Sequence, residues 1–121
     1  MKYLCLIYDD EKKLGAMPKS ESDAFMGEYY AFTEGIQKSG HYVSAQSLEW
    51  DTKTIRPKKG RPVVTDGPFV EAKEQVGGLV IIEARDLDEA VKIASLHPAA
   101  HLGETLGWAI DVRAIAEGCH Q

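Results

Sequence analysis

The sequence predicts an α+β fold of the ferredoxin-like type, with an antiparallel sheet built in the order βαββαβ and a β-hairpin inserted after the second strand. Two segments with apolar residues at helical spacing alternate with strand-like segments. Residues 2–8 and 76–84 are largely apolar, as in strands that are buried on both faces. A Lys-Lys-Gly turn at 58–60 separates two short alternating segments. The 121 residues fit one domain, 1–121.

The first strand and the first helix follow from local signals. Lys2–Tyr8 is a continuous apolar strand, and a charged loop follows it. Ser20 and Asp23 form a variant of the capping box, so the first helix is expected to begin there. Gly40 is expected to end that helix, as a glycine just past a helix usually does. Four residues at helical spacing predict its buried stripe: Phe25, Tyr29, Phe32 and Ile36.

The middle of the chain predicts strands only. Residues 41–48 form the second strand of the main sheet. Residues 53–56 and 61–65 form the inserted hairpin around the turn at 58–60. The third strand of the main sheet spans 76–84.

The last third predicts a helix and a strand. Asp86 and Glu89 form a second capping box that opens the second helix. His97-Pro98 stops that helix, because the residue before a proline leaves the helical region easily. The fourth strand spans 108–115. One face of the second helix is expected to carry Leu87, Ala90, Val91 and Ala94.

The predicted sheet has one face that no helix covers. Both helices of this fold lie on the same face of the sheet. In the strands at 2–8 and 76–84, the alternate positions on either side are apolar, so the second face is apolar as well. We therefore expect that face to pack against a second copy of the chain, which makes the protein a homodimer.

The fourth strand sorts its residues between these two faces. Ile110 and Val112 suit packing against the helices, so Asp111 and Arg113 point to the second face. There Arg113 either pairs with Asp111 or binds an anionic group of a ligand through its guanidinium.

Other candidate binding residues lie near the hairpin and in the second strand. Asp66 ends a strand, because Gly67-Pro68 cannot continue the ladder, and acids at strand ends often belong to sites. Lys73 and Glu74 form either a solvated loop with weak ion pairs or, if Lys73 folds over Asp66, the rim of a pocket. Gln46 either orients a polar ligand or satisfies a backbone group.

Basic residues gather around the hairpin. They are Lys53, Arg56, Lys58, Lys59 and Arg61. A solvated hairpin tip explains most of them. Arg56 is kept as a candidate that binds an anionic ligand, because alternation turns it away from Ile55.

Charge and composition exclude several classes of partner. A net charge of −5 argues against nucleic acid. The apolar segment at 2–8 is too short for a signal peptide or a membrane span, so we expect a cytoplasmic protein with no membrane partner. Cys5 is expected to be a buried thiol and Cys119 to lie in a tail. Neither the cysteines nor the four histidines show metal-ligand spacing, and no cofactor-binding motif occurs, so no metal or cofactor is predicted.

Taken together, these motifs resemble the DGPF branch of the YCII-related family. The branch is named after the tetrad Asp66-Gly67-Pro68-Phe69, and the resemblance runs from Met1 to about Ile115. The other anchors are Met1-Lys2-Tyr3, Thr54-Ile55-Arg56, Glu71 with Lys73 and Glu74, Gly77-Gly78, and Asp111-Val112-Arg113. The resemblance implies a dimeric α+β barrel, in agreement with the homodimer expected from the apolar second face.

His97 is the best single acid–base candidate, because imidazole titrates near neutral pH. The alternative is a charged histidine that the helix dipole stabilises. In the family an acid often precedes this proline, and a histidine near the start of the first helix is its proposed partner. Here His97 stands in the place of the acid and the first helix has no histidine, so Asp66 is taken as the partner of His97.

Two functions fit this sequence. The first is a small-molecule-binding protein that acts as a cofactor-independent acid–base enzyme, of the lyase, isomerase or dehalogenase type, on an anionic or phenolic metabolite. The alternative is a non-catalytic binding or regulatory accessory module, because DGPF relatives often occur near extracytoplasmic-function sigma factor systems. An enzyme should bring His97 and Asp66 to one ligand position together with one of the two candidate arginines. Candidates scattered over separate surfaces favour the accessory module.

Overall fold

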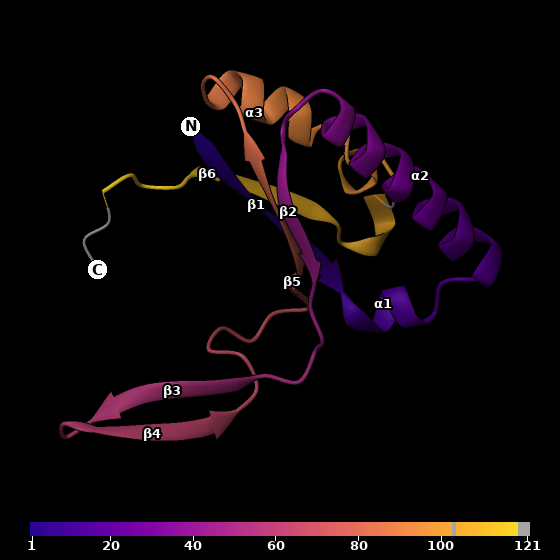
Figure 1. Ribbon diagram of the computed structural model, residues 1–121. Helices are drawn as coiled ribbons and strands as arrows, with labels where there is room; N and C mark the ends of the chain where they lie inside the picture. Colours follow the sequence, from indigo (N-terminus) through magenta and orange to yellow (C-terminus); the bar gives the residue numbers. More distant parts are fainter. Residues whose placement is uncertain (103, 119–121) are drawn as a thin grey trace.

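A four-stranded antiparallel sheet in the order β2-β5-β1-β6 forms the centre of the molecule (Figure 1). The computed structural model describes residues 1–102 and 104–118. The sheet strands are β1 (Lys2–Asp10), β2 (Tyr42–Ser47), β5 (Glu74–Glu83) and β6 (Ala109–Ala114). The hairpin strands β3 (Lys53–Lys58) and β4 (Arg61–Asp66) form a separate sheet. The helices are α1 (Glu11–Gly15), α2 (Lys19–Lys38) and α3 (Leu87–Ala94), with short 3-10 turns η1 (Pro98–Ala100) and η2 (Glu104–Leu106). The α+β ferredoxin-like fold and the inserted hairpin are confirmed.

Strand β1 is central and sets the register of the sheet. Cys5 lies opposite Val80 of β5 and opposite Val112 of β6. The strand runs two residues beyond the predicted Tyr8, because Asp10 still pairs with Glu74 of β5. Asp10 then caps α1, as its Oδ1 accepts hydrogen bonds from the backbone amides of Lys12 (3.1 Å) and Lys13 (3.2 Å).

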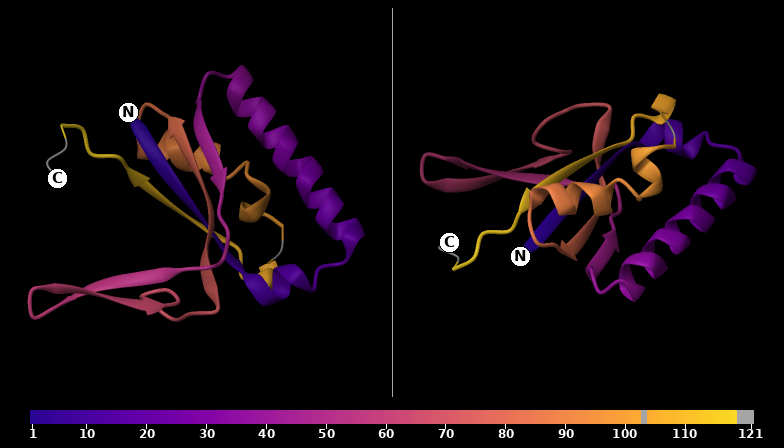
Figure 2. Two further views of the ribbon diagram at one scale, coloured as in Figure 1. Left: turned by 60° about the horizontal axis from the view of Figure 1, so that its bottom comes forward. Right: turned by 90° about the horizontal axis from the view of Figure 1, so that it is seen from above.

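Helices α2 and α3 cover one face of the sheet, and the core lies between them and the sheet (Figure 2). Of the predicted stripe on α2, Phe32 and Ile36 are buried, whereas Phe25 and Tyr29 are only half-buried. Cys5 is in the core as expected, and burial raises the pKa of its thiol to about 11. This thiol is therefore a small hydrophobic group and not a nucleophile.

The helix boundaries confirm some capping predictions and correct others. Asp86 caps α3 as predicted, since its Oδ1 accepts a hydrogen bond from the Glu89 amide at 2.9 Å. Gly40 follows the end of α2 with φ of 80°, a conformation that glycine adopts most easily. The capping box at Ser20 is wrong, because α2 begins one residue earlier and Pro18 precedes it without a side-chain cap. The Pro18 carbonyl accepts the first hydrogen bonds of the helix, from the amides of Glu21 and Ser22 at 3.0 Å each.

The buried face of α3 differs in part from the prediction. Ala90 and Ala94 are buried as expected, together with Ile93. Leu87 and Val91 are 50% and 45% exposed. Because Ala90, Ile93 and Ala94 form the buried stripe, Leu87 and Val91 lie at the edge of that stripe.

Within residues 1–102 and 104–118, no helix covers the second face of the sheet (Figure 2). Its apolar side chains are half-buried in the single chain: Leu4, Leu6, Leu79 and Ile81. Asp111 and Arg113 are exposed on strand β6, where they alternate with Ile110 and Val112, which pack on the core as predicted. We call this surface the open sheet face.

Cys119 lies outside the described residues, and no helix within them is long and apolar enough to cross a membrane.

We predict that Ile82→Ala lowers the free energy of unfolding by about 2 to 5 kcal/mol, because Ile82 is fully buried on the central strand β5 and alanine leaves a cavity there. Val91→Ala on the exposed side of α3 should change it by no more than about 0.5 kcal/mol. Urea unfolding followed by circular dichroism measures both values. Equal losses in the two variants would contradict the assigned core.

Candidate functional site

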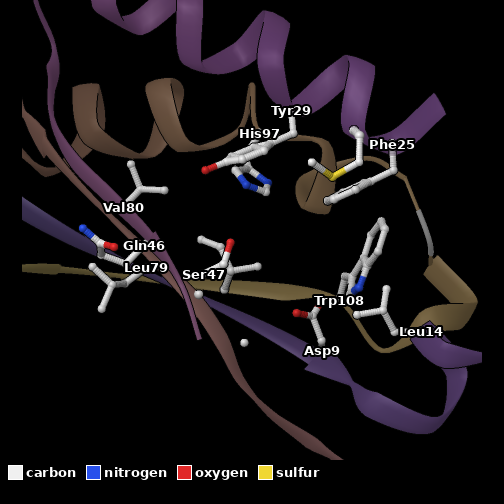
Figure 3. Close-up of a pocket in the computed structure, with 14 residues that line it drawn as sticks. Asp9, Leu14, Phe25, Tyr29, Gln46, Ser47, Leu79, Val80, His97 and Trp108 are labelled. Carbon is white, nitrogen blue, oxygen red and sulfur yellow. The ribbon is translucent and has the colours of Figure 1, made fainter. Parts of the chain in front are cut away.

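A cavity of about 110 Å³ lies between α2 and the sheet (Figure 3). Its wall combines side chains from α2 with residues of β1 and β5, the end of β2 and the segment that follows α3. None of the described residues that line it is a lysine or an arginine. Because α2 forms one of its walls, the cavity lies on the helix-covered face of the sheet. The sequence analysis had placed the ligand on the opposite face.

His97 forms part of the cavity wall and is only 4% exposed. Aromatic rings of α2 surround it, with centroid distances of 5.6 Å to Tyr29 and 5.0 Å to Phe32. The backbone amide of Ala99 donates a hydrogen bond to Nδ1 at 2.9 Å, so Nδ1 carries no proton and the neutral ring has its proton on Nε2. Burial lowers the pKa of His97 to about 4, with a smaller effect from His101. At neutral pH His97 is thus an uncharged hydrogen-bond donor, and the helix-dipole alternative, which needs a charged ring, is not supported.

Asp9 lines the same cavity at the end of β1 (Figure 3). Burial raises the pKa of its carboxyl to about 6. Gly77 makes room for this side chain, because a Cβ at that position would collide with Oδ2 of Asp9. The pairing shifts from Ile7–Gly78 to Tyr8–Val76, so Gly77 is the extra residue of a β-bulge. The bulge and the missing Cβ together place a carboxyl that can exchange its proton near neutral pH inside the wall.

Trp108 supplies another N–H group next to the cavity. Its Nε1 is buried and has no hydrogen-bond partner among the described residues. The indole packs on Phe25 of α2, with ring centroids 4.4 Å apart. A buried N–H group without a partner loses free energy that a ligand oxygen could restore.

The hairpin holds two of the predicted site residues, and neither lines the cavity. Asp66 has a side chain that is 86% exposed, and it pairs with Lys53 and not with Lys73. Arg56 lies over the ring of Phe69, with 5.2 Å between its Cζ and the ring centroid. Neither residue lines the cavity, and the hairpin strands β3 and β4 extend away from α2 (Figure 1).

The remaining predicted residues lie around the sheet. Gln46 lines the cavity, but it is exposed and pairs with Leu79, so its side chain shares the open sheet face with Leu79 (Figure 3). Arg113 is exposed on the same face, and the described residues show no ion pair between it and Asp111. Lys73 and Glu74 are exposed at the start of β5 and do not line the cavity.

Asp9 is the residue that the sequence interpretation missed, because it reads as the first of a run of charged loop residues. The alternation of side chains along β1 could have identified it. Tyr3, Cys5 and Ile7 face the helices, and Asp9 continues the same side of the strand. Gly77, which the sequence marked only as half of a glycine pair, leaves the space for the carboxyl.

The site offers no group of ligands for a metal ion. Within residues 1–102 and 104–118, no three His, Cys, Asp or Glu side chains lie close enough to hold one. What the cavity does offer is a carboxyl with a raised pKa, a neutral imidazole and an unpartnered indole N–H, in largely apolar surroundings.

The chain is similar to known proteins over most of its length. The model of the YCII-related domain matches residues 1–110. An uncharacterised protein of Rhizobium meliloti (strain 1021) is 34% identical over 96 residues, which cover 78% of this chain and 77% of that protein. With a match over most of its length, the chain belongs to the YCII-related family.

Proposed function

We propose that this protein binds a small uncharged organic molecule in the cavity under α2 and transfers a proton to or from it without a cofactor. The observation that carries this proposal is that Asp9, with its raised pKa, and the neutral His97 line one cavity. Titratable groups with strongly shifted pKa values in a cavity are typical of acid–base sites. Asp9 lines the same cavity as His97 and so takes the role that the sequence interpretation had given to Asp66.

The cavity favours a phenolic or carbonyl compound over an anionic one. Its volume of about 110 Å³ is of the order of cavities that hold benzene. No described lysine or arginine lines it, so a buried carboxylate or phosphate would have no opposite charge. Of the two ligand classes expected from the sequence, the phenolic class fits this wall better.

In the proposed reaction Asp9 is the base and His97 is the donor that stabilises charge. Ionised Asp9 takes a proton from a carbon next to a carbonyl group, and the electron pair of that C–H bond moves into the enolate, leaving its charge on oxygen. The Nε2–H group of His97 donates a hydrogen bond to this oxygen. Asp9 then returns the proton to the same carbon or to another one, and the second outcome is an isomerisation.

A second function is favoured by a separate observation. Asp66 and Arg56 lie on the hairpin, Arg113 lies on the open sheet face, and His97 lies in the cavity. This scatter of the residues expected to form one site favours a non-catalytic binding or accessory module, in which the cavity holds a ligand without turnover.

We also propose that the protein is a homodimer that covers the open sheet face. Leu6 and Ile81 are half-buried there without any covering helix, and a second copy would remove this apolar surface from water.

Deuterium exchange tests the proposed base. We predict that the protein accelerates the incorporation of solvent deuterium into cyclopentanone, followed by ¹H NMR in D₂O, with a rate that rises as the pH passes through about 6 because Asp9 must be ionised. Asp9→Asn should lower the accelerated rate by at least about 100-fold, the usual scale for loss of a positioned base. Asp66→Asn on the hairpin is the matched control and should leave the rate unchanged. Full exchange by Asp9→Asn would remove Asp9 from the mechanism. Binding of phenol without any exchange would favour the non-catalytic module.

The pH dependence of stability should report the buried carboxyl. The folded state raises the pKa of Asp9 from its ordinary value of 3.8 to about 6, so folding binds a proton between these pH values. The Asp9 contribution to stability is therefore present at low pH and is lost as the pH rises through about 6. We expect Asp9→Asn to gain stability relative to the wild type between about pH 4 and about pH 7, measured by urea unfolding. His97 shifts stability in the opposite direction, but equally in the wild type and in Asp9→Asn, so it cancels when the two are compared. If the difference in unfolding free energy between them did not change with pH, Asp9 would not be buried.

A methyl group at position 77 should displace the Asp9 carboxyl and weaken ligand binding in the cavity. The new Cβ of Gly77→Ala would collide with the Asp9 carboxyl, so this carboxyl must leave its position. We expect phenol binding, measured by NMR titration, to weaken by at least about 10-fold, which corresponds to about 1.4 kcal/mol. Gly35→Ala is the matched control, because a Cβ at this helical position meets nothing within 4 Å. Equal phenol affinity in the two variants would contradict the assigned role of Gly77.

A further inference from the structure

The hairpin stands away from the body of the molecule as an isolated two-stranded sheet. We call Lys53–Asp66 the arm. In all the views it extends away from α2, on the side of the sheet that no helix covers (Figures 1 and 2). Every residue of β4 is exposed, and so is every residue of β3 except Thr54. A two-stranded sheet that buries so little is only marginally stable on its own.

The two faces of the arm differ in chemistry. Ile55 pairs with Val64 and Pro57 pairs with Pro62, and alternation places these four residues on one apolar face. Ile55 is 68% exposed and Val64 is 59% exposed. The other face is basic near its tip, where Lys58 pairs with Arg61.

The arm is nevertheless held in a defined position. The amide of Gly67 donates to the carbonyl of Thr52 at 2.8 Å, and the hydroxyl of Thr54 donates to the carbonyl of Gly67 at 2.7 Å. At the tip, Lys59 and Gly60 have φ values of 51° and 76°, as in the tight turns that fix hairpin register. An ordered arm that presents an apolar face to water indicates a surface that another molecule covers.

The prolines decide how a partner can bind. Pro57 and Pro62 have no amide hydrogen, so the outer half of the arm cannot extend the sheet of a partner by a regular ladder. A partner therefore docks on the apolar face of the arm and not along its edge.

Charge identifies the kind of partner. The arm has five basic residues and one acid, a net charge of +4, so the rest of the chain carries −9 of the total of −5. A second copy of this chain thus offers a strongly acidic body to the basic arm. The open sheet face, which is apolar and lies on the side toward which the arm extends, places such a copy within its reach.

We propose that the arm of each chain packs with its apolar face on the apolar open sheet face of a second copy, with its basic tip close to the acidic body of that copy, so that two reciprocal arm contacts hold the dimer. This inference depends on the homodimer proposed above and is independent of the cavity chemistry. In a two-fold dimer each arm contact occurs twice, so a modest contact counts double in the association free energy.

Removal of the arm tests this proposal. Joining Thr52 to Gly67 deletes residues 53–66 at a point where the two ends already lie together, because the Gly67 amide donates a hydrogen bond to the Thr52 carbonyl at 2.8 Å. We expect sedimentation velocity across the micromolar range to show a wild-type dimer and a deletion variant that dimerises at least about 10-fold more weakly. The far-ultraviolet circular dichroism and the urea unfolding midpoint should stay close to those of the wild type, which shows that the body is still folded. Added salt should weaken the wild-type dimer, because it screens the attraction between arm and body.

Single substitutions locate the contact on the arm. Ile55→Gln changes the apolar face and should weaken dimerisation by at least about 10-fold, whereas Thr65→Gln on the other face should not. Ile81→Gln tests the open sheet face separately. If Ile81→Gln breaks the dimer and the arm deletion does not, the homodimer stands and the arm inference is wrong. A wild-type protein that stays a single protomer overturns both. Arm-dependent binding of a DNA duplex to such a protomer would assign the basic face to nucleic acid instead.

Discussion

Asp9 lies at the end of the helix-facing side of β1, above the bulge at Gly77, and the candidate site depends on this placement. The side that carries Tyr3, Cys5 and Ile7 into the core carries a carboxyl at its next position. A side chain at residue 77 would occupy the same space as that carboxyl. Because the surroundings are largely apolar and contain no described lysine or arginine, burial shifts the carboxyl toward its protonated form.

His97 experiences the same burial, which shifts its pKa in the opposite direction. Burial favours the neutral form of both groups, so it raises the pKa of Asp9 and lowers that of His97. The Ala99 amide fixes which ring nitrogen has the proton. Both groups are therefore uncharged between about pH 4 and about pH 6, and above about pH 6 Asp9 becomes a proton acceptor while His97 stays a neutral hydrogen-bond donor.

The two faces of the sheet differ in what they contain. The helix-covered face contains the core and the cavity, whereas the open sheet face and the arm present apolar surface to the outside. The sequence interpretation assigned ligand binding and dimerisation to the same face, since it placed ligand-binding residues such as Arg113 in a dimer interior. If two chains associate through the open sheet face as proposed, a substitution there should leave the cavity intact, and a substitution in the cavity should leave the association intact.

Patterns along the chain were sufficient for the ferredoxin-like order, the inserted hairpin, the cap at Asp86 and the family, because each depends on neighbouring residues or on alternation within one element. His97 also emerged as a candidate from its place before Pro98. The partner of His97 did not, because Asp9 and His97 are 88 positions apart and line one cavity only in the packed fold. Burial of a charged side chain, the space above a glycine and the face on which a cavity opens are properties of packed elements. No local pattern encodes them.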